Sequence, residues 1–337
     1  MTDSIVRAIP SAKKLTSVLS LAVLSFLPSL KANAQVDYSV VYVNEETSLN
    51  LTQITSDNDY VCMPQVKRSG RNVNWLSNRI IDISVDGAQL AYLSARNNTT
   101  NIFIKGVSKQ GGSVQRTNRS AVLDFSYSPD GKYICFSESN GNSNHIFQTS
   151  ATNGYICRQI TSNSKDYSPV YSKDMKDIFF TRQEGKGFNI WSYNIANNFL
   201  SNYSKGMNPY PLSSGVMLCS RTNAAGRSEI WRVNYNTGNE ECIVADPVKS
   251  FTTPQISPDV KWILMVGSSV LMNGNRPYSN TDIYVCRTDG TQLSQLTYHA
   301  ADDLSPVWSR DGKYIYFISQ RGSATATANV WRMSFEL

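Results

Sequence analysis

Short apolar runs alternate with polar turns along most of this chain, at a nearly constant period. Each run follows a turn of the form Ser-x-Asp-Gly or a close variant, in which glycine accepts a positive φ and aspartate bonds its own backbone. The period is 44, 44, 41, 44 and 52 residues, and residues 271–280 account for the one long interval. The turns begin at Ser84, Ser128, Ser172, Ser213 (a degenerate copy), Ser257 and Ser309.

The runs predict strands, because they are rich in β-branched and aromatic residues and no stretch after the N-terminal segment keeps a helical period. The run after each turn is followed by a polar loop and by a second run that opens with a β-branched and an aromatic residue. These second runs begin at Ile102, Ile146, Ile190, Ile230, Ile283 and Val330. With a strand before each turn and another at the end, each unit has four strands. Six such units predict an all-β, six-bladed β-propeller of four-stranded blades.

The two ends of the chain indicate how the ring closes. The last unit stops at Leu337, after its third strand, whereas residues 41–55 align without gaps on residues 283–297 of the fifth unit. Residues 49–55 are therefore predicted to supply the fourth strand of the final blade, which would close the ring and remove an unpaired edge. Residues 41–43 duplicate a third strand that residues 329–335 already provide. Residues 56–80 fit the repeat poorly and are predicted to be an irregular insertion.

The repeat resembles that of the TolB-type propeller family. The similarity is carried by residues 128–137, 305–319 and 282–285 with 295–297, and it extends over about residues 40–337. It implies a stand-alone propeller, since the sequence has no segment long enough for the separate N-terminal α/β domain of TolB. It also implies a protein partner in the cell envelope, such as an envelope protein or an outer-membrane lipoprotein.

The first 34 residues have the pattern of a cleavable export signal. Lys13 and Lys14 precede an apolar run over residues 15–27, and residues 32–34 read Ala-Asn-Ala, the small-x-small pattern that precedes cleavage. The run is too short and too interrupted to predict a membrane span, although an uncleaved anchor helix is the alternative. Cleavage between Ala34 and Gln35 would leave residues 35–337 as a periplasmic protein.

Charge and composition exclude several classes of function. The predicted mature chain carries 28 basic and 25 acidic residues, a net charge of +3 that argues against a nucleic-acid partner. There is no nucleophile-elbow, phosphate-loop or dinucleotide motif. His145 and His299 are the only two histidines, and both are expected to be polar rim residues; a metal site would need carboxylates from other blades. We therefore expect no catalytic residues, no metal and no cofactor.

Six cysteines in an exported chain raise the question of disulfides. Cys135 and Cys157 occupy the second and fourth strands of one predicted blade, and Cys219 and Cys242 occupy the same places in another. Two strand spacings, roughly 9–10 Å, exceed the Cα separation of about 7 Å that a bridge allows. The cysteines are therefore expected to be small buried hydrophobic residues, with Cys62 and Cys286 left unassigned.

Several second strands end in arginine, which predicts a ring of positive charge around one mouth of the channel. Two aspartates, each shortly before a Ser-Pro pair, should emerge on the same face. One interpretation is a set of local Arg–Asp pairs that tie neighbouring blades together; the other is a ring that binds carboxylates of a partner, for which arginine is well suited. The candidate partner-binding residues are Arg96, Arg182, Arg221, Arg321, Asp166 and Asp303.

Taken together, these observations favour a non-catalytic, periplasmic, protein-binding propeller that acts as a scaffold or accessory in envelope assembly or transport. A propeller that binds a glycan or small ligand through exposed Tyr and Trp side chains is the alternative. A lyase or a peptidase accessory is a third hypothesis, disfavoured by the absence of paired catalytic acids.

Overall fold

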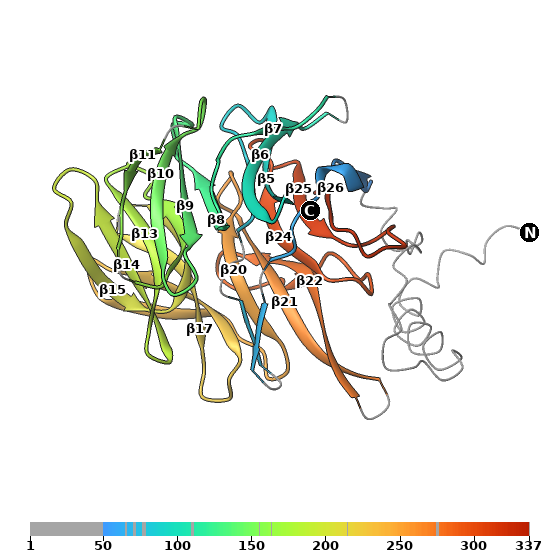
Figure 1. Ribbon diagram of the computed structural model, residues 1–337. Helices are drawn as coiled ribbons and strands as arrows, with labels where there is room; N and C mark the ends of the chain where they lie inside the picture. The colour runs from blue at the N-terminus through green and yellow to red at the C-terminus, as the bar shows by residue number, and fades with distance from the viewer. Residues whose placement is uncertain are drawn as a thin grey trace, which may run out of the picture.

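A computed structural model describes residues 50–336, except residues 65, 70, 71, 76–78, 109, 110, 155, 163, 214, 274 and 275. The predicted export signal and residues 41–43 lie outside the described residues. The described chain forms six four-stranded antiparallel sheets arranged in a ring, together with a two-stranded ribbon and one short 3-10 helix (Figure 1). The predicted all-β, six-bladed propeller is confirmed.

The blades follow one another in chain order, and the first strand of each lies nearest the ring axis. Blade 1 contains β4 (Ile81–Ile83), β5 (Gln89–Arg96), β6 (Thr99–Gly106) and β7 (Val114–Gln115). Blade 2 contains β8 (Val122–Tyr127), β9 (Tyr133–Ser139), β10 (Asn144–Ser150) and β11 (Ile156–Gln159). Blade 3 contains β12 (Asp166–Tyr171), β13 (Asp177–Glu184), β14 (Gly187–Asn194) and β15 (Leu200–Lys205).

The second half of the ring repeats this arrangement. Blade 4 contains β16 (Met207–Ser213), β17 (Val216–Thr222), β18 (Ser228–Asn234) and β19 (Asn239–Val244). Blade 5 contains β20 (Ser250–Ile256), β21 (Trp262–Asn273), β22 (Arg276–Arg287) and β23 (Ser294–Gln295). Blade 6 contains β24 (Asp303–Trp308), β25 (Tyr314–Ser319), β26 (Asn329–Ser334) and, from the other end of the chain, β1 (Thr52–Gln53).

The Ser-x-Asp-Gly turns connect the first and second strands of the blades, and hydrogen bonds of the serine and aspartate side chains stabilise each turn. In blade 2 the Ser128 hydroxyl donates to Asp130 at 2.6 Å and accepts from the Tyr133 amide at 2.9 Å, while Gly131 has a φ of 72°. The same bonds recur at the turns that begin at Ser84, Ser172, Ser257 and Ser309. We call the face of the ring that carries these turns the turn face. The opposite face, with the loops between second and third strands, is the loop face.

The first strands of blades 3 to 6 share a bulge that bends them around the axis. In each, one residue with a left-handed backbone precedes a proline, and the pairing with the second strand shifts at that point. The left-handed residues are Ser168, Asn208, Thr253 and Ser305, with φ between 50° and 57°. Proline fits because a bulge leaves its missing N–H without a ladder partner.

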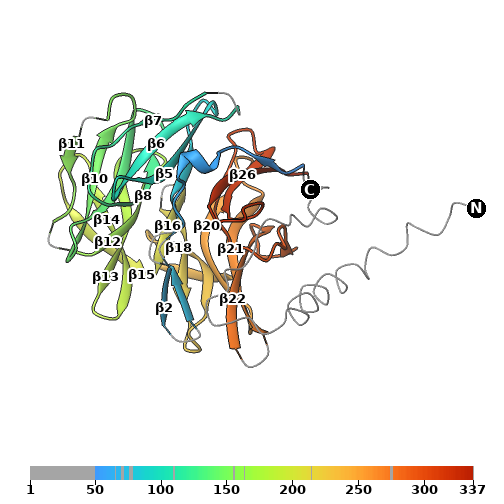
Figure 2. The same ribbon diagram turned by 45° about the vertical axis from the view of Figure 1, so that its right-hand side comes forward.

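Blade 1 carries an insertion at the place of this bulge. The Cys62 amide donates to the Leu93 carbonyl at 3.0 Å, and the Leu93 amide donates to the Ile80 carbonyl at 3.0 Å. Residues 60–62 and β4 are therefore two pieces of one interrupted inner strand, both paired with β5. Residues 63–79 lie between them and include the ribbon of β2 (Val66–Ser69) and β3 (Asn72–Trp75). Figure 2 shows β2 leaving the middle of the ring on the same side as the far end of β22.

The N-terminal segment connects blade 6 to blade 1. Thr52 and Gln53 pair with Arg332 and Trp331 of β26, so β1 is the outermost strand of that sheet. The 3-10 helix η2 (Asp57–Asp59) follows, and Asp59 accepts hydrogen bonds from Tyr92 and from Lys105 of blade 1, each at 2.9 Å. That this segment is what keeps the ring closed remains a prediction.

Apolar side chains fill the spaces between blades, and several cysteines are among them. Cys135, Cys219 and Cys286 are buried free thiols, and burial raises the pKa of each to about 12. The prediction that cysteines are buried is wrong for Cys242, which is an exposed free thiol because its strand, β19, is the outermost of blade 4. Cys62 is a half-buried free thiol, and the side chain of Cys157 lies outside the described residues.

Candidate functional site

The predicted arginines lie where second strands end, and two of them pair with the predicted aspartates of their own blade. Arg182 donates from Nε and Nη2 to the two carboxylate oxygens of Asp166, at 2.7 and 3.0 Å, and the two residues are direct register partners in blade 3. Arg321 is paired with Asp303 within blade 6, and both side chains are fully buried. These are local pairs, as one interpretation expected, but each lies within one blade and does not tie neighbouring blades.

The other two arginines of that group are partly exposed and bound differently. Arg221 is paired with Glu240 of the same blade at 2.6 Å. Arg96 donates from Nε to Ser94 and from Nη2 to Ser113, and its guanidinium lies 4.1 Å from the centre of the Phe103 ring. The structure therefore engages all four guanidinium groups internally, and contact of any of them with a partner stays a prediction.

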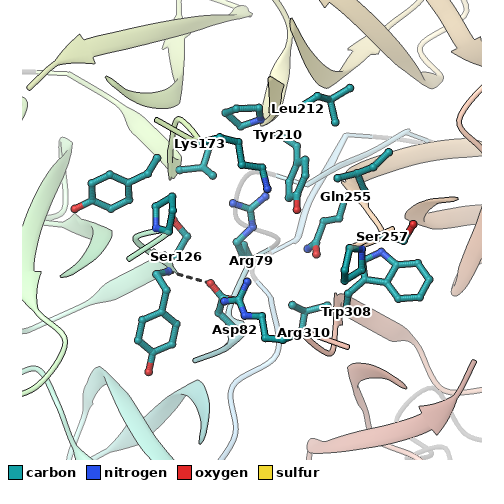
Figure 3. Close-up of a pocket in the computed structure, with 18 of the residues that line it drawn as sticks. Arg79, Asp82, Ser126, Lys173, Tyr210, Leu212, Gln255, Ser257, Trp308 and Arg310 are labelled. Carbon is teal, nitrogen blue, oxygen red and sulfur yellow. Dashed lines mark hydrogen bonds and ion pairs between the residues drawn. The ribbon is translucent and has the colours of Figure 1, made fainter. Parts of the chain in front are cut away.

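A cavity of about 330 Å³ occupies the channel mouth on the opposite side, the turn face. Every blade contributes to its wall one residue from the last part of its first strand, close to the turn (Figure 3). The six equivalent residues are Asp82, Ser126, Val170, Tyr210, Gln255 and Val307. The repeat thus brings one side chain from each of the six blades to the same small site.

Arg79, the last residue of the insertion, lies at the centre of this site (Figure 3). Its carbonyl accepts from the Phe125 amide of blade 2 at 3.0 Å, which fixes the backbone, and the residue is only 8% exposed. Its guanidinium lies 5.6 Å from the centre of the Tyr210 ring. No hydrogen bond or ion pair joins that guanidinium to another described residue.

A second cation approaches the same aromatic ring. The ammonium of Lys173, in the turn of blade 3, lies 5.5 Å from the centre of the Tyr210 ring, and Figure 3 shows it converging with Arg79. The Lys173 side chain forms no ion pair with a described residue, and the residue is exposed at the mouth. Two positive charges therefore lie near one aromatic ring, and no carboxylate of a described residue forms an ion pair with either of them.

Asp82 and Arg310 line the other side of the mouth, and both bind groups of a neighbouring blade. Asp82 accepts from the Tyr127 amide of blade 2 at 2.9 Å and from the Ile83 amide at 2.8 Å. Arg310 of blade 6 donates to the Ser84 carbonyl at 3.1 Å and lies 3.8 Å from Asp82. The charge left over at the mouth is thus that of Arg79 and Lys173.

A buried carboxyl group lies near this positive charge. Asp124 is fully buried in β8, accepts from the Ser137 hydroxyl at 2.5 Å and from the Ser168 amide of blade 3 at 2.9 Å. Burial raises the pKa of Asp124 to about 6, although these hydrogen bonds and the charge of Arg79 act in the opposite direction. At neutral pH Asp124 is therefore largely ionised and offsets part of the charge of Arg79 without forming an ion pair with it.

The described residues that line the cavity suit binding more than acid–base chemistry. Asp82 is the carboxylate among them, and no group of three or more His, Cys, Asp or Glu that could hold a metal occurs in the described part of the chain. His145 is half-buried on the loop face of blade 2, and His299 is buried, where its Nδ1 accepts from the Ala301 amide at 2.9 Å. Sequence reasoning missed Arg79, whose signal was a lone basic residue directly before the first strand of blade 1.

Comparison with known proteins identifies the architecture. No family model matches the sequence. A putative TolB from Agrobacterium tumefaciens superposes with a TM-score of 0.59 and 16% identity, over 79% of this chain and 92% of that one. The fold is TolB-like. TolB from Acinetobacter baumannii gives a TM-score of 0.56 and 15% identity over 74% of this chain and 64% of that one.

Enzymes share the TolB-like fold. An oligogalacturonate lyase from Vibrio parahaemolyticus gives a TM-score of 0.56 and 12% identity, over 85% of this chain and 93% of that one. At such identities the likeness establishes the fold and leaves activity to be argued from the site. In the described part of this TolB-like chain, no helix is both long enough and apolar enough to cross a membrane.

Proposed function

We propose that this TolB-like propeller is a non-catalytic binding module, exported to the periplasm, that holds a protein partner during envelope assembly or transport. The observation that carries the proposal is the channel mouth on the turn face. All six blades contribute to a small cavity there, and its excess positive charge is unpaired. Such a site suits a negatively charged segment of a partner, because pockets of this size bind an extended segment or a small group and not a folded surface.

The surroundings of the cavity favour a protein segment. Val260 lines the mouth and is 61% exposed, and Val85 in the turn of blade 1 is 42% exposed. Pro129, Pro258 and Leu212 add further apolar lining. An apolar rim around a cationic floor matches a peptide with both apolar and acidic side chains better than it matches a uniformly hydroxylated sugar.

An acidic oligosaccharide is the second candidate, and one observation favours it. Tyr210 and Trp308 line the same cavity as the cations, and aromatic rings beside positive charge could stack on uronic acid rings. A lyase with this fold is named for oligogalacturonate. A glycan ligand would use the same mouth and would be separated from a protein partner by direct binding measurements.

The test is capture of the partner from the envelope in which the protein is made. Tagged protein is purified after mild crosslinking in three forms: the wild type, a turn-face variant (Arg79→Met with Lys173→Met) and a loop-face variant (Arg96→Ala with Arg221→Ala). The loop-face variant leaves Arg182 and Arg321 in place, because removing either would strand a buried aspartate. Thermal unfolding checks that all three forms are folded.

We expect a stoichiometric protein that is retained by the wild type and the loop-face variant and lost by the turn-face variant. Loss of the partner by the loop-face variant alone would show that the partner binds the arginines at the ends of the second strands. If folded protein captures no stoichiometric partner in any form, the proposal of a protein-binding module is refuted. Fractionation of the same cells shows whether the protein is in the periplasm.

A further inference from the structure

The convergence of Arg79 and Lys173 is costly unless something negative lies between them. Both cations lie within 6 Å of the centre of one ring, that of Tyr210, and their like charges repel across the cavity. Arg79 is also nine-tenths buried, so water solvates its charge poorly. Proteins normally give a buried guanidinium a carboxylate, as this chain does for Arg182 and Arg321.

Trp308 also lines the cavity, but its indole N–H belongs to the core of the blade. That nitrogen is buried and has no hydrogen-bond partner among the described residues, and the Trp308 ring centre lies 4.7 Å from that of Phe335. The charges that are left for a ligand in the cavity are therefore those of Arg79 and Lys173, which reach it from the insertion in blade 1 and from blade 3.

We propose that Arg79 and Lys173 bind one carboxylate of the partner segment, carried either by an acidic side chain or by the C-terminus of the chain. The planar guanidinium of Arg79 donates two parallel N–H groups to its oxygens, and the flexible Lys173 ammonium closes on it from the mouth. This proposal rests on the proposed function, because it names the group by which the partner enters the channel.

The charge of the wall favours a carboxylate over a phosphate. The carboxylate of Asp82 lines the same cavity, and its repulsion is about twice as large for a dianion as for a carboxylate. The apolar lining, including Val170 and Leu212, accommodates the aliphatic stem that carries a side-chain carboxylate. The geometry therefore points to one negative charge on an apolar stem.

The proposal is tested with small probes that need no knowledge of the partner. Acetyl-Ala-Glu-Ala-amide carries a side-chain carboxylate, and acetyl-Ala-Ala-Ala carries a C-terminal one. Acetyl-Ala-Gln-Ala-amide is the neutral control, and inorganic phosphate and trigalacturonate represent the other anion classes. Binding is followed by titration calorimetry of the mature protein at low and at high salt.

We expect one or both carboxylate peptides to bind more tightly than the neutral peptide, with weaker binding at high salt. Arg79→Met should weaken binding by about tenfold or more, and Lys173→Met by a smaller factor. Arg79→Lys should restore part of the affinity. Arg227→Met is the matched control, since Arg227 lies in the loop between β17 and β18 on the loop face, and it should leave binding unchanged.

Several outcomes would overturn the proposal. Equal binding of the glutamate and glutamine peptides, or equal binding by wild type and both Met variants, would show that the pair does not select a carboxylate. Tighter binding of phosphate or trigalacturonate would assign another ligand class. Lys173 is exposed, so its variant keeps the test valid if Arg79→Met does not fold. If the protein binds the carboxylate peptides but captures no partner from the envelope, the carboxylate site is supported and the protein-binding function is refuted. If the protein captures a partner but does not bind the carboxylate peptides, only the carboxylate site is refuted.

Discussion

Replacing Asp124 with asparagine is expected to stabilise the protein at neutral pH, because the wild-type protein keeps an ionised carboxylate in its interior there. Asp124 is fully buried, and its pKa is raised by burial from 3.8 to about 6. A rise of that size corresponds to about 3 kcal/mol, at about 1.4 kcal/mol per pH unit. Asparagine keeps an oxygen for the Ser168 amide but forces the Ser137 hydroxyl to reorient, which costs about 1 kcal/mol. The net gain at neutral pH is therefore about 2 kcal/mol.

The sign of the pH dependence follows from the direction of the pKa change. Because the folded-state pKa lies above the unfolded value of 3.8, the protonated carboxyl contributes its full stability below about pH 4. That contribution is lost as the pH rises through about 6. The variant should thus be slightly less stable than the wild type near pH 4 and more stable near pH 7, with the crossover between them.

The assay is urea unfolding of both proteins at a series of pH values from about 4 to 8, with the free energy of unfolding from the transition midpoint and slope. Asp130→Asn in the neighbouring turn is the matched control. Burial raises the pKa of Asp130, but hydrogen bonds from Ser128 and the Lys132 amide lower it overall, so the difference between this variant and wild type should stay nearly constant from about pH 5 to 8. A difference between Asp124→Asn and wild type that does not change with pH would refute the reasoning.

Three further outcomes are expected. Asp59→Ala should cost about 3–5 kcal/mol in urea unfolding, because it leaves Lys105 charged and buried, and Asp59→Ala with Lys105→Met should recover part of the loss; equal stability of the single variant and wild type would show that the pair does not hold the N-terminal segment. Gly267→Ala should cost about 1–3 kcal/mol, because its Cβ would lie 2.5 Å from the Tyr284 ring, and an unchanged melting temperature would contradict this. In the native protein Cys242 should react with a maleimide first, as mass spectrometry of tryptic peptides can show, whereas reaction should require unfolding at Cys135, Cys219 and Cys286.

The fold was predictable because the interactions that form each turn lie within a few residues of sequence. The serine and aspartate of five of the six turns bond locally, so a motif of four residues marks the same corner of those blades. The arginine ring was harder to predict, because Arg182 and Asp166 become neighbours only through the register of β12 and β13, which shifts at the bulge. Asp166 and Arg182 are 16 residues apart in the sequence, and this separation alone does not reveal the shift in register.

The channel site was out of reach for a related reason. Five of its six equivalent wall positions could have been aligned from the repeat, since each lies two residues before the serine of its turn; Tyr210 lies three residues before Ser213. Arg79 could not, because it lies in the segment that departs from the repeat. The hydrogen bonds of Leu93 to both Cys62 and Ile80 show that this segment interrupts an inner strand. Because of that interruption, Arg79, the last residue of the segment, lies near the axis of the ring.

The interrupted inner strand of blade 1 has a consequence for the covalent continuity of the chain. Leu93 holds both pieces of that strand, and Asp59 anchors the first piece to Lys105, so neither depends on the peptide bonds of residues 63–79 to stay in place. We expect a protease that cuts within the ribbon of β2 and β3 to leave a nicked ring whose two fragments copurify. The entropy of a longer connection also grows slowly with its length. The ribbon is therefore the position at which a foreign domain could be spliced into the ring, or the chain divided into two separately expressed fragments, without removing a pairing between blades.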